Sequence, residues 1–318
     1  MFTPPSSPLP AKRELEPRFS LPATTPRSSR IELVIGGIKV YVYGLNELVR
    51  KADVEIAVLY LGHNRKRSYL VTEDIAYEVL HRYRCERRQK RYELIALTMN
   101  MRNHGDREVS PQANLTWDDG NDNHGMDLLS MISGSCQDFK LILDYLPTYL
   151  PQFTRFHNII AGVSLGGHTA WRMASLVAPG QIEGYAMVVG CPSLTPLLLS
   201  RLGIDEASAH DADMNYDDLV KIMTEEQKRR WPRVLDEMVK RSDKAVAAEF
   251  PRDVPVLLCN GVVDPLVPAK YTVAWVDRRK QVDKHDRVHL FIQDNTGHSC
   301  TKEMVGLLAL WLGDVFQA

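Results

Sequence analysis

Two hydrophobic patterns alternate along most of this chain. Short continuous apolar runs, such as residues 56–61 and 94–99, are typical of strands buried on both faces of a sheet. Between them lie longer stretches in which apolar residues recur every three or four positions, as helices require. Strands are expected at 31–35, 38–43, 56–61, 94–99, 185–190, 254–259 and 288–292, with another through Ile159 and Ile160. Helices are expected from about Thr72, over about 126–149, from the strand end at 163 to near 179–180, and over about 301–316.

The order of these elements predicts the fold class. Two β-rich runs around Gly36-Gly37 indicate an antiparallel hairpin at the start. Strands that alternate with helices afterwards indicate a mostly parallel sheet covered by helices on both faces. The chain is therefore expected to be an α/β protein.

Two segments depart from this alternation. Residues 1–30 are rich in Pro, Ser and Thr, and a disordered tail is expected there because few aliphatic residues can offset the entropy of ordering. Residues 31–318 are expected to form one domain. Within it, residues of about 191–250 predict a helical insertion that caps the sheet, with a capping box at Thr224-Gln227 and a further helix opened by Pro232.

Composition narrows the classes of function. The 318 residues include 39 basic and 40 acidic side chains, a balance that argues against nucleic acid as the main partner. Five scattered cysteines without a C-x-x-C pair indicate reduced thiols rather than a disulfide framework or zinc site. No apolar run is long enough for a membrane span and no secretory signal is visible. A soluble cytoplasmic protein acting on a small molecule is expected, and its oligomeric state stays open.

The strongest chemical signal is the stretch Gly162-Val163-Ser164-Leu165-Gly166. It follows an apolar strand and precedes helix-forming residues, which is the context of a G-x-S-x-G nucleophile elbow. Such a turn exposes the Ser164 hydroxyl above the sheet, and the Leu165 amide at the helix start is placed to bind a negative oxygen. Ser164 is therefore the candidate nucleophile and Leu165 a candidate oxyanion donor.

Two further side chains are candidates to form a catalytic triad with Ser164. Asp264 comes just after the strand at 254–259, and His298 comes just after the strand at 288–292. Carboxyl ends of parallel strands meet at one edge of a sheet, so the three groups can converge. A serine needs an imidazole to take its proton, and the imidazole needs a carboxylate to fix its tautomer. His298 is the expected base and Asp264 the expected carboxylate, with Asp294 as the main alternative.

These features together resemble the α/β-hydrolase superfamily. The resemblance spans about 31–318 and rests on residues 162–166, 261–265, 297–298 and 102–105. Residues 190–194 resemble small prolyl-oligopeptidase-like serine esterases, and residues 117–127 resemble uncharacterised fungal α/β hydrolases, which implies a secondary-metabolite setting. The resemblance also implies a second oxyanion donor after the strand at 56–61. There the usual His-Gly pair is replaced by Gly62-His63-Asn64, so the Asn64 amide is expected to serve, with His63 as second choice.

Other reactive residues receive structural interpretations. His104 and His168 are expected to be hydrogen-bonded or packed, and His63 and His124 lack metal-ligand spacing, so neither a metal nor a cofactor is expected. The run 65–67, Arg-Lys-Arg, is interpreted as a solvated basic loop, with contact to an anionic substrate as the alternative. Cys191 is not expected to be a nucleophile, because no histidine is near it in the sequence.

The sequence therefore predicts a serine hydrolase that cleaves a carboxylic ester or thioester through an acyl-enzyme. A small-substrate peptidase or a carbon–carbon hydrolase would use the same residues, and the fold does not separate them. A non-catalytic ligand-binding protein on this fold is the alternative from another class.

Overall fold

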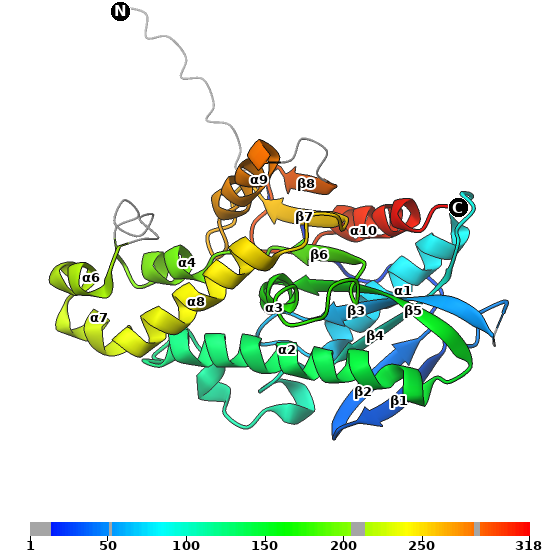
Figure 1. Ribbon diagram of the computed structural model, residues 1–318, viewed down its shortest axis with the longest axis horizontal. Helices are drawn as coiled ribbons and strands as arrows, with labels where there is room; N and C mark the ends of the chain where they lie inside the picture. Colours follow the sequence, from blue (N-terminus) through cyan, green and yellow to red (C-terminus); the bar gives the residue numbers. More distant parts are fainter. Residues whose placement is uncertain (1–13, 51–52, 205–213, 283–286) are drawn as a thin grey trace, which may run out of the picture.

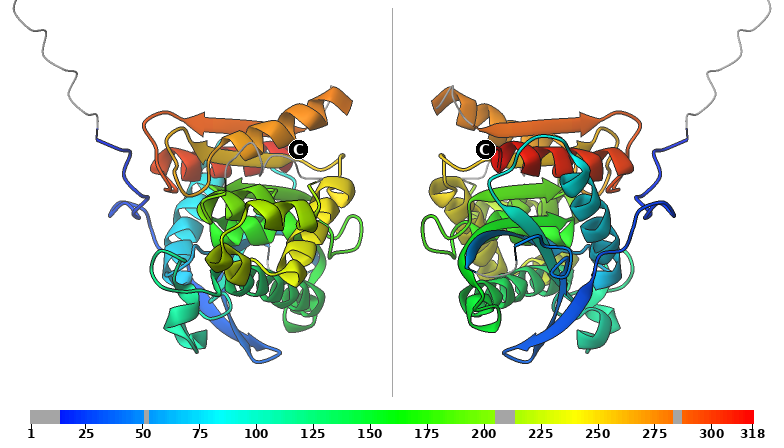
Figure 2. Two further views of the ribbon diagram at one scale, coloured as in Figure 1. Left: turned by 90° about the vertical axis from the view of Figure 1, so that its left-hand side faces the viewer. Right: turned by 90° about the vertical axis from the view of Figure 1, so that its right-hand side faces the viewer.

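A single sheet dominates the computed structural model, which describes residues 14–50, 53–204, 214–282 and 287–318. Its strands lie in the order β1-β2-β4-β3-β5-β6-β7-β8, with the hairpin at one edge and β8 at the other (Figures 1 and 2). The strands are β1 (Arg30–Ile35), β2 (Ile38–Tyr43), β3 (Val54–Gly62), β4 (Glu93–Met99), β5 (Phe153–Val163), β6 (Gly184–Val188), β7 (Val256–Gly261) and β8 (Val288–Gln293). β1 and β2 pair antiparallel, β2 pairs antiparallel with β4, and the other neighbours are parallel. The predicted mixed sheet is confirmed.

Helices cover both faces of this sheet, as predicted. The side chains of Val58 and Tyr60 on β3 enter one apolar core, while Leu59 and Leu61 enter the other. This alternation explains why β3 reads as a continuous apolar run. The first core is closed by α2 (His124–Tyr149), α3 (Leu165–Met173), α8 (Arg233–Glu249) and α9 (Lys270–Val282). The second is closed by α1 (Tyr69–Cys85) and α10 (Lys302–Val315).

The hairpin turn has the geometry that its two glycines predict. Gly36 and Gly37 have φ angles of 56° and 81°, and Ile35 pairs with Ile38 across them. Two successive left-handed residues between paired strands are typical of a type I′ turn, which matches the twist of the strands.

Two helix boundaries differ from the sequence prediction, and one helix was not predicted. α1 begins at Tyr69, and Thr72 lies inside it instead of capping it. The Thr72 hydroxyl contacts Tyr69 O and Thr98 Oγ1, at 2.9 and 2.5 Å, so a buried partner on β4 has replaced the expected capping role. α3 ends at Met173, short of residues 179–180. α9 was not predicted, because charged residues interrupt its apolar period.

Helices occupy the described part of the segment between β6 and β7. These are α4 (Leu194–Arg201), α6 (Tyr216–Ile222), α7 (Glu225–Arg230) and α8. The predicted capping box at Thr224 and Gln227 is present at the start of α7. Residues 205–213 of the predicted insertion lie outside the described residues.

One buried carboxylate fixes the position of α4. Asp243 on α8 accepts hydrogen bonds from the first two amides of α4, those of Leu194 and Thr195, at 2.8 and 2.7 Å. It also pairs with Arg172 on α3 at 2.9 Å. A carboxylate at a helix N-terminus satisfies amides that have no partner within the helix and interacts favourably with the helix dipole. Asp243 therefore ties α4, and with it Arg201 at the end of α4, to the helices that pack on the sheet.

Candidate active site

A tight crossing of backbones shapes the turn between β5 and α3. Ser164 has φ 54° and ψ −106°, a conformation that non-glycine residues rarely adopt. A Cβ added to Gly162 would lie 2.2 Å from the Gly166 carbonyl, and one added to Gly166 would lie 2.0 Å from Gly62 O. Three glycines are thus required where β3, β5 and α3 meet. The Gly166 amide donates to His63 O at 3.1 Å and locks the crossing.

Asp264 is held in the turn that follows β7. Its carboxyl group is buried, and Oδ1 accepts hydrogen bonds from the amides of Leu266 and Val267, both at 2.9 Å. These bonds leave Oδ2 for another donor and fix the direction in which it points.

That donor is His298, in the loop between β8 and α10. His298 Nδ1 lies 2.8 Å from Asp264 Oδ2, and Nε2 lies 2.8 Å from Ser164 Oγ. An ionised carboxylate can only accept, so Nδ1 carries the proton and Nε2 accepts from the serine hydroxyl. The structure therefore brings Ser164, His298 and Asp264 together, and Asp264 rather than Asp294 contacts the imidazole.

Part of the expected N-terminal tail lies against this histidine loop. Residues 14–29 contain no helix or strand, and residues 1–13 lie outside the described residues. The amides of Glu16 and Phe19 donate to Asn295 O and Cys300 O, at 2.9 and 2.7 Å, on either side of His298. The second half of the segment predicted to be a flexible tail thus packs on the domain and forms part of the site.

Two residues that line the cavity beside Ser164 have backbone amides without a protein acceptor in the described part of the chain. Within the described residues, no protein acceptor contacts the amide of Leu165 or that of Asn64, and both residues line the cavity beside Ser164. His63 differs, because it is fully buried and does not line the cavity. Of the two predicted donors in this loop, Asn64 is therefore the one that can reach a ligand.

The buried His63 ring instead forms hydrogen bonds that hold the loop after β3 in place. Its Nε2 lies 3.0 Å from the Met101 amide, which can only donate, so the ring proton resides on Nδ1. Nδ1 in turn donates to Asn64 O at 2.8 Å. Burial lowers the pKa of His63 to about 3, which keeps the ring neutral.

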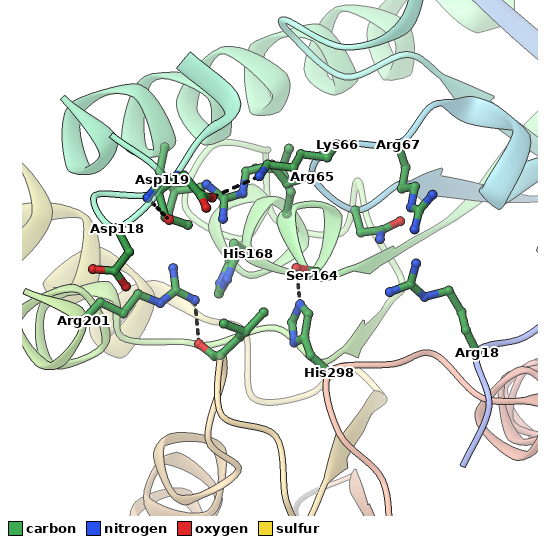
Figure 3. Close-up of a pocket in the computed structure, with 15 residues that line it drawn as sticks. Arg18, Arg65, Lys66, Arg67, Asp118, Asp119, Ser164, His168, Arg201 and His298 are labelled. Atoms are coloured by element: carbon green, nitrogen blue, oxygen red, sulfur yellow. Dashed lines mark hydrogen bonds and ion pairs between the residues drawn. The ribbon is translucent and has the colours of Figure 1, made fainter. Parts of the chain in front are cut away.

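The cavity in front of Ser164 has a volume of about 680 Å³ and a strongly basic lining (Figure 3). Its charged residues are Arg18, Arg65, Lys66, Arg67 and Arg201, against Asp118 and Asp119. Sequence reasoning missed Arg18 and Arg201 and interpreted Arg65 as solvated. Only the run at 65–67 gave a local signal, and the solvated interpretation fits the exposed Lys66 and Arg67 but not the half-buried Arg65.

The remaining candidate residues have structural partners. His104 is buried and its Nδ1 lies 2.8 Å from Arg102 O, away from the cavity. His168 is also buried, and its Nδ1 accepts from the Cys191 amide at 3.0 Å. Although this places a histidine beside Cys191, burial raises the pKa of the Cys191 thiol to about 12, so a thiolate nucleophile is disfavoured.

The described ranges hold no candidate metal-binding group and no candidate membrane-spanning helix. No three His, Cys, Asp or Glu side chains there form a group that could hold a metal ion. Likewise, none of the helices in these ranges has the length and apolar character needed to cross a membrane.

Comparisons with known proteins show similarity in structure only. No protein-family model matches the sequence, and no curated protein is significantly similar to it. TT1662 from Thermus thermophilus superposes with a TM-score of 0.64 at 14% identity, covering 92% of this chain and 100% of that one. The Pyrococcus furiosus esterase Pf2001 gives 0.53 at 15% identity, covering 95% and 98%. A Pyrobaculum calidifontis esterase gives 0.54 at 14% identity, covering 93% and 88%.

These structures agree with the predicted topology. Together with the sheet order and the sharp turn at Ser164, they show that the chain has the α/β-hydrolase fold. At such low identity the similarity extends to the fold and not to the reaction.

The buried neutral histidines predict how stability depends on pH. Burial lowers the pKa of both His63 and His124 to about 3 in the folded protein. An unfolded histidine has a pKa of about 6.5, so the unfolded chain binds more protons as the pH falls below that value. Stability should be full above about pH 6.5 and should fall by about 2 kcal/mol per histidine between pH 7 and 5.

Urea unfolding of the wild type and of His124→Gln at pH 7, 6 and 5 tests this prediction. The wild type should lose stability on acidification, and the variant should lose about 2 kcal/mol less over the same interval. An identical pH dependence in both proteins would contradict a neutral, buried His124.

The contact between the N-terminal segment and the His298 loop makes a second prediction. Deleting residues 1–20 removes the two amide donors that hold Asn295 and Cys300. Amides of residues 294–301 should then exchange with deuterium at least about tenfold faster, because local opening becomes easier. Peptides from α2 serve as the internal control and should be unchanged. Equal protection of 294–301 in both proteins would show that the segment does not order this loop.

Proposed function

We propose that this protein is a serine hydrolase that cleaves a carboxylic ester or thioester of a small molecule through an acyl-enzyme. The observation that carries the proposal is the continuous chain of hydrogen bonds from Ser164 Oγ through His298 to Asp264, at 2.8 Å for each link. It borders a cavity large enough for a small substrate. The esterases among the structures of similar fold support a hydrolytic reaction as well.

In the first half of the reaction, Ser164 Oγ attacks the carbonyl carbon while His298 Nε2 takes the hydroxyl proton. The carbonyl oxygen becomes negatively charged. Asp264 stabilises the imidazolium that forms and keeps Nδ1 protonated, which its two amide contacts from residues 266 and 267 support by fixing the carboxylate. The tetrahedral intermediate collapses when His298 passes its proton to the leaving oxygen or sulfur.

The amides of Leu165 and Asn64 are the proposed oxyanion donors. Both residues line the cavity beside Ser164, and both amides are unpaired within the described part of the chain. Each donor of this kind typically lowers the barrier by about 3–4 kcal/mol. His63 is a positioning residue in this scheme, since its Nδ1 holds the Asn64 carbonyl from the side away from the cavity.

In the second half, water replaces the leaving group. His298 Nε2 removes a proton from that water, which attacks the acyl carbon and forms a second tetrahedral intermediate. Collapse of this intermediate returns the proton to Ser164 Oγ and releases a carboxylic acid. The cycle consumes one water molecule and needs no cofactor.

The helical insertion is proposed to act as a cap over this site. Arg201 at the end of α4 lines the same cavity as Ser164 and His298, which supports this role. The insertion would then determine which substrates fit, while residues at the strand ends perform the chemistry.

Reaction with a fluorophosphonate tests the proposal, because the reagent phosphonylates an activated serine and releases fluoride. We expect stoichiometric modification at Ser164, none in Ser164→Ala, and labelling at least about 10³-fold slower in His298→Ala. The rate constant is measured by mass spectrometry of the intact protein over time.

A matched pair of carboxylate variants provides the control. Asp264→Asn should slow labelling by a similarly large factor, whereas Asp294→Asn should retain the wild-type rate. Folded protein that resists the reagent would favour the alternative of a non-catalytic ligand-binding protein.

A further inference from the structure

The cavity contains positive charge that the described protein does not neutralise. Arg201 is the clearest case. Its Nη2 donates to Leu266 O, but its Nε is buried and has no hydrogen-bond partner. No carboxylate lies within ion-pair distance of Arg201 in the described ranges, and its environment lowers its pKa to about 10 through burial first and the charge of Arg65 second.

Arg65 adds a second cation in the same situation. Its Nη1 contacts two neutral groups, Leu115 O and His124 Nδ1, both at 3.2 Å. The contact with His124 cannot supply negative charge, because burial holds that ring neutral with a pKa of about 3. Burial likewise lowers the pKa of Arg65 itself. Two partly desolvated guanidinium groups that repel one another are costly unless an anion joins them.

The neighbouring carboxylates offset this charge only in part. Asp119 favours the charged form of Arg65, and Asp264 that of Arg201, but neither lies within ion-pair distance of these arginines. Asp119 is already paired with Lys66 at 3.1 Å, and Asp118 has an exposed side chain beyond ion-pair distance of Arg201. His168 lines the cavity as a neutral ring whose proton resides on Nε2, since Nδ1 accepts from the Cys191 amide. This arrangement adds a donor and no negative charge.

The unpaired cations lie around the reactive serine. Figure 3 shows Ser164 and His298 between Arg201 on one side and Arg18 on the other, and Arg65 lines the same cavity. A substrate placed for attack by Ser164 would therefore meet a guanidinium group if it extended toward Arg201 or toward Arg18. Guanidinium forks bind carboxylate and phosphate groups through paired, charge-assisted hydrogen bonds.

We propose that the substrate carries an anionic group, a carboxylate or a phosphate, which binds Arg201 and Arg65 while its ester carbonyl lies at Ser164. This inference rests on the proposed hydrolase function and names the substrate class of the same site. Arg201 is the main specificity determinant, because its position is fixed by α4 and the Asp243 contacts and because it lines the cavity without a carboxylate partner among the described residues.

Matched esters that differ by one charge test the proposal. One pair is 4-nitrophenyl valerate and the 4-nitrophenyl monoester of glutarate, with the charge on the acyl side. The other is phenyl butyrate and 4-carboxyphenyl butyrate, with the charge on the leaving group. The wild type should hydrolyse the charged member of at least one pair with a kcat/KM at least about tenfold higher. A third arm, with 4-phosphonophenyl butyrate, distinguishes a phosphate-type site from a carboxylate site.

Variants assign the preference to the arginine. Arg201→Gln should abolish the preference for charge, because kcat/KM should fall at least about tenfold more for the charged ester than for its neutral partner. Arg201→Lys should retain part of it, because it keeps the charge and loses the fork. Arg229→Gln, the same change at an exposed residue of α7 outside the cavity, should retain the full preference. Equal rates on charged and neutral esters in the wild type, or an equal loss on both in Arg201→Gln, would overturn the proposal.

A binding measurement separates this inference from the proposed function. Calorimetry with full-length Ser164→Ala needs no turnover, and it should show the charged ester bound at least about tenfold tighter than its neutral partner. Anion-selective binding without hydrolysis by the wild type would reject the hydrolase and retain the anion site. Hydrolysis without selectivity in binding or rate would support the hydrolase and reject the anion site.

Discussion

The site depends on one steric constraint, the contact of three backbones at Gly62, Gly162 and Gly166. Because none of these residues has a side chain, the loop after β3, the end of β5 and the start of α3 approach within distances that any Cβ would prevent. The same contact holds Ser164 at a positive φ, which is tolerated only when surrounding structure enforces it. The position of the hydroxyl, the free amide of Leu165 and the nearness of Asn64 all follow from this crossing.

The arginines that line the cavity determine the electrostatic potential of the site. Ser164, Asp264 and His298 all come just after strands, as do the amides of Leu165 and Asn64, and a parallel sheet gathers such strand ends at one edge. Two of the arginines come from elsewhere, Arg201 from a helix of the insertion and Arg18 from the N-terminal segment, whereas Arg65 follows Asn64 in the loop after β3. In the proposed function the α/β scaffold carries the reacting groups, while segments outside it supply part of the charge that selects a substrate. Asp243 connects the insertion to the scaffold, since this residue of α8 contacts both α4, which carries Arg201, and α3, which follows Ser164.

The sequence predicts the sheet well, and it predicts that Ser164, Asp264 and His298 converge, for physical reasons that act locally. Strands buried on both faces are rich in apolar residues, as β7 and the end of β5 are, whereas the edge strand β8 is half-buried. Ser164, Asp264 and His298 each follow one of these strands within a turn rich in Gly, Pro or Asn. The cationic lining could not be predicted, because whether Arg65 or Arg201 faces solvent depends on the packing of distant segments. Arg65, for instance, is covered by Leu115 and His124, about fifty and sixty residues away. The packing of residues 14–29 could not be predicted for a similar reason, since two of their amides bond to residues 295 and 300, far along the chain.

The most direct measurement of the central claim is the mass of the protein quenched in acid during turnover of an activated ester. If Ser164 forms an acyl-enzyme, the intact mass rises by that of the acyl group, and after proteolysis the adduct maps to Ser164. The signal should accumulate before the first turnover is complete and disappear when the ester is exhausted. Ester consumption with an acyl group on another residue, or with no adduct at any time point in a variant whose deacylation is slowed, would contradict catalysis by Ser164.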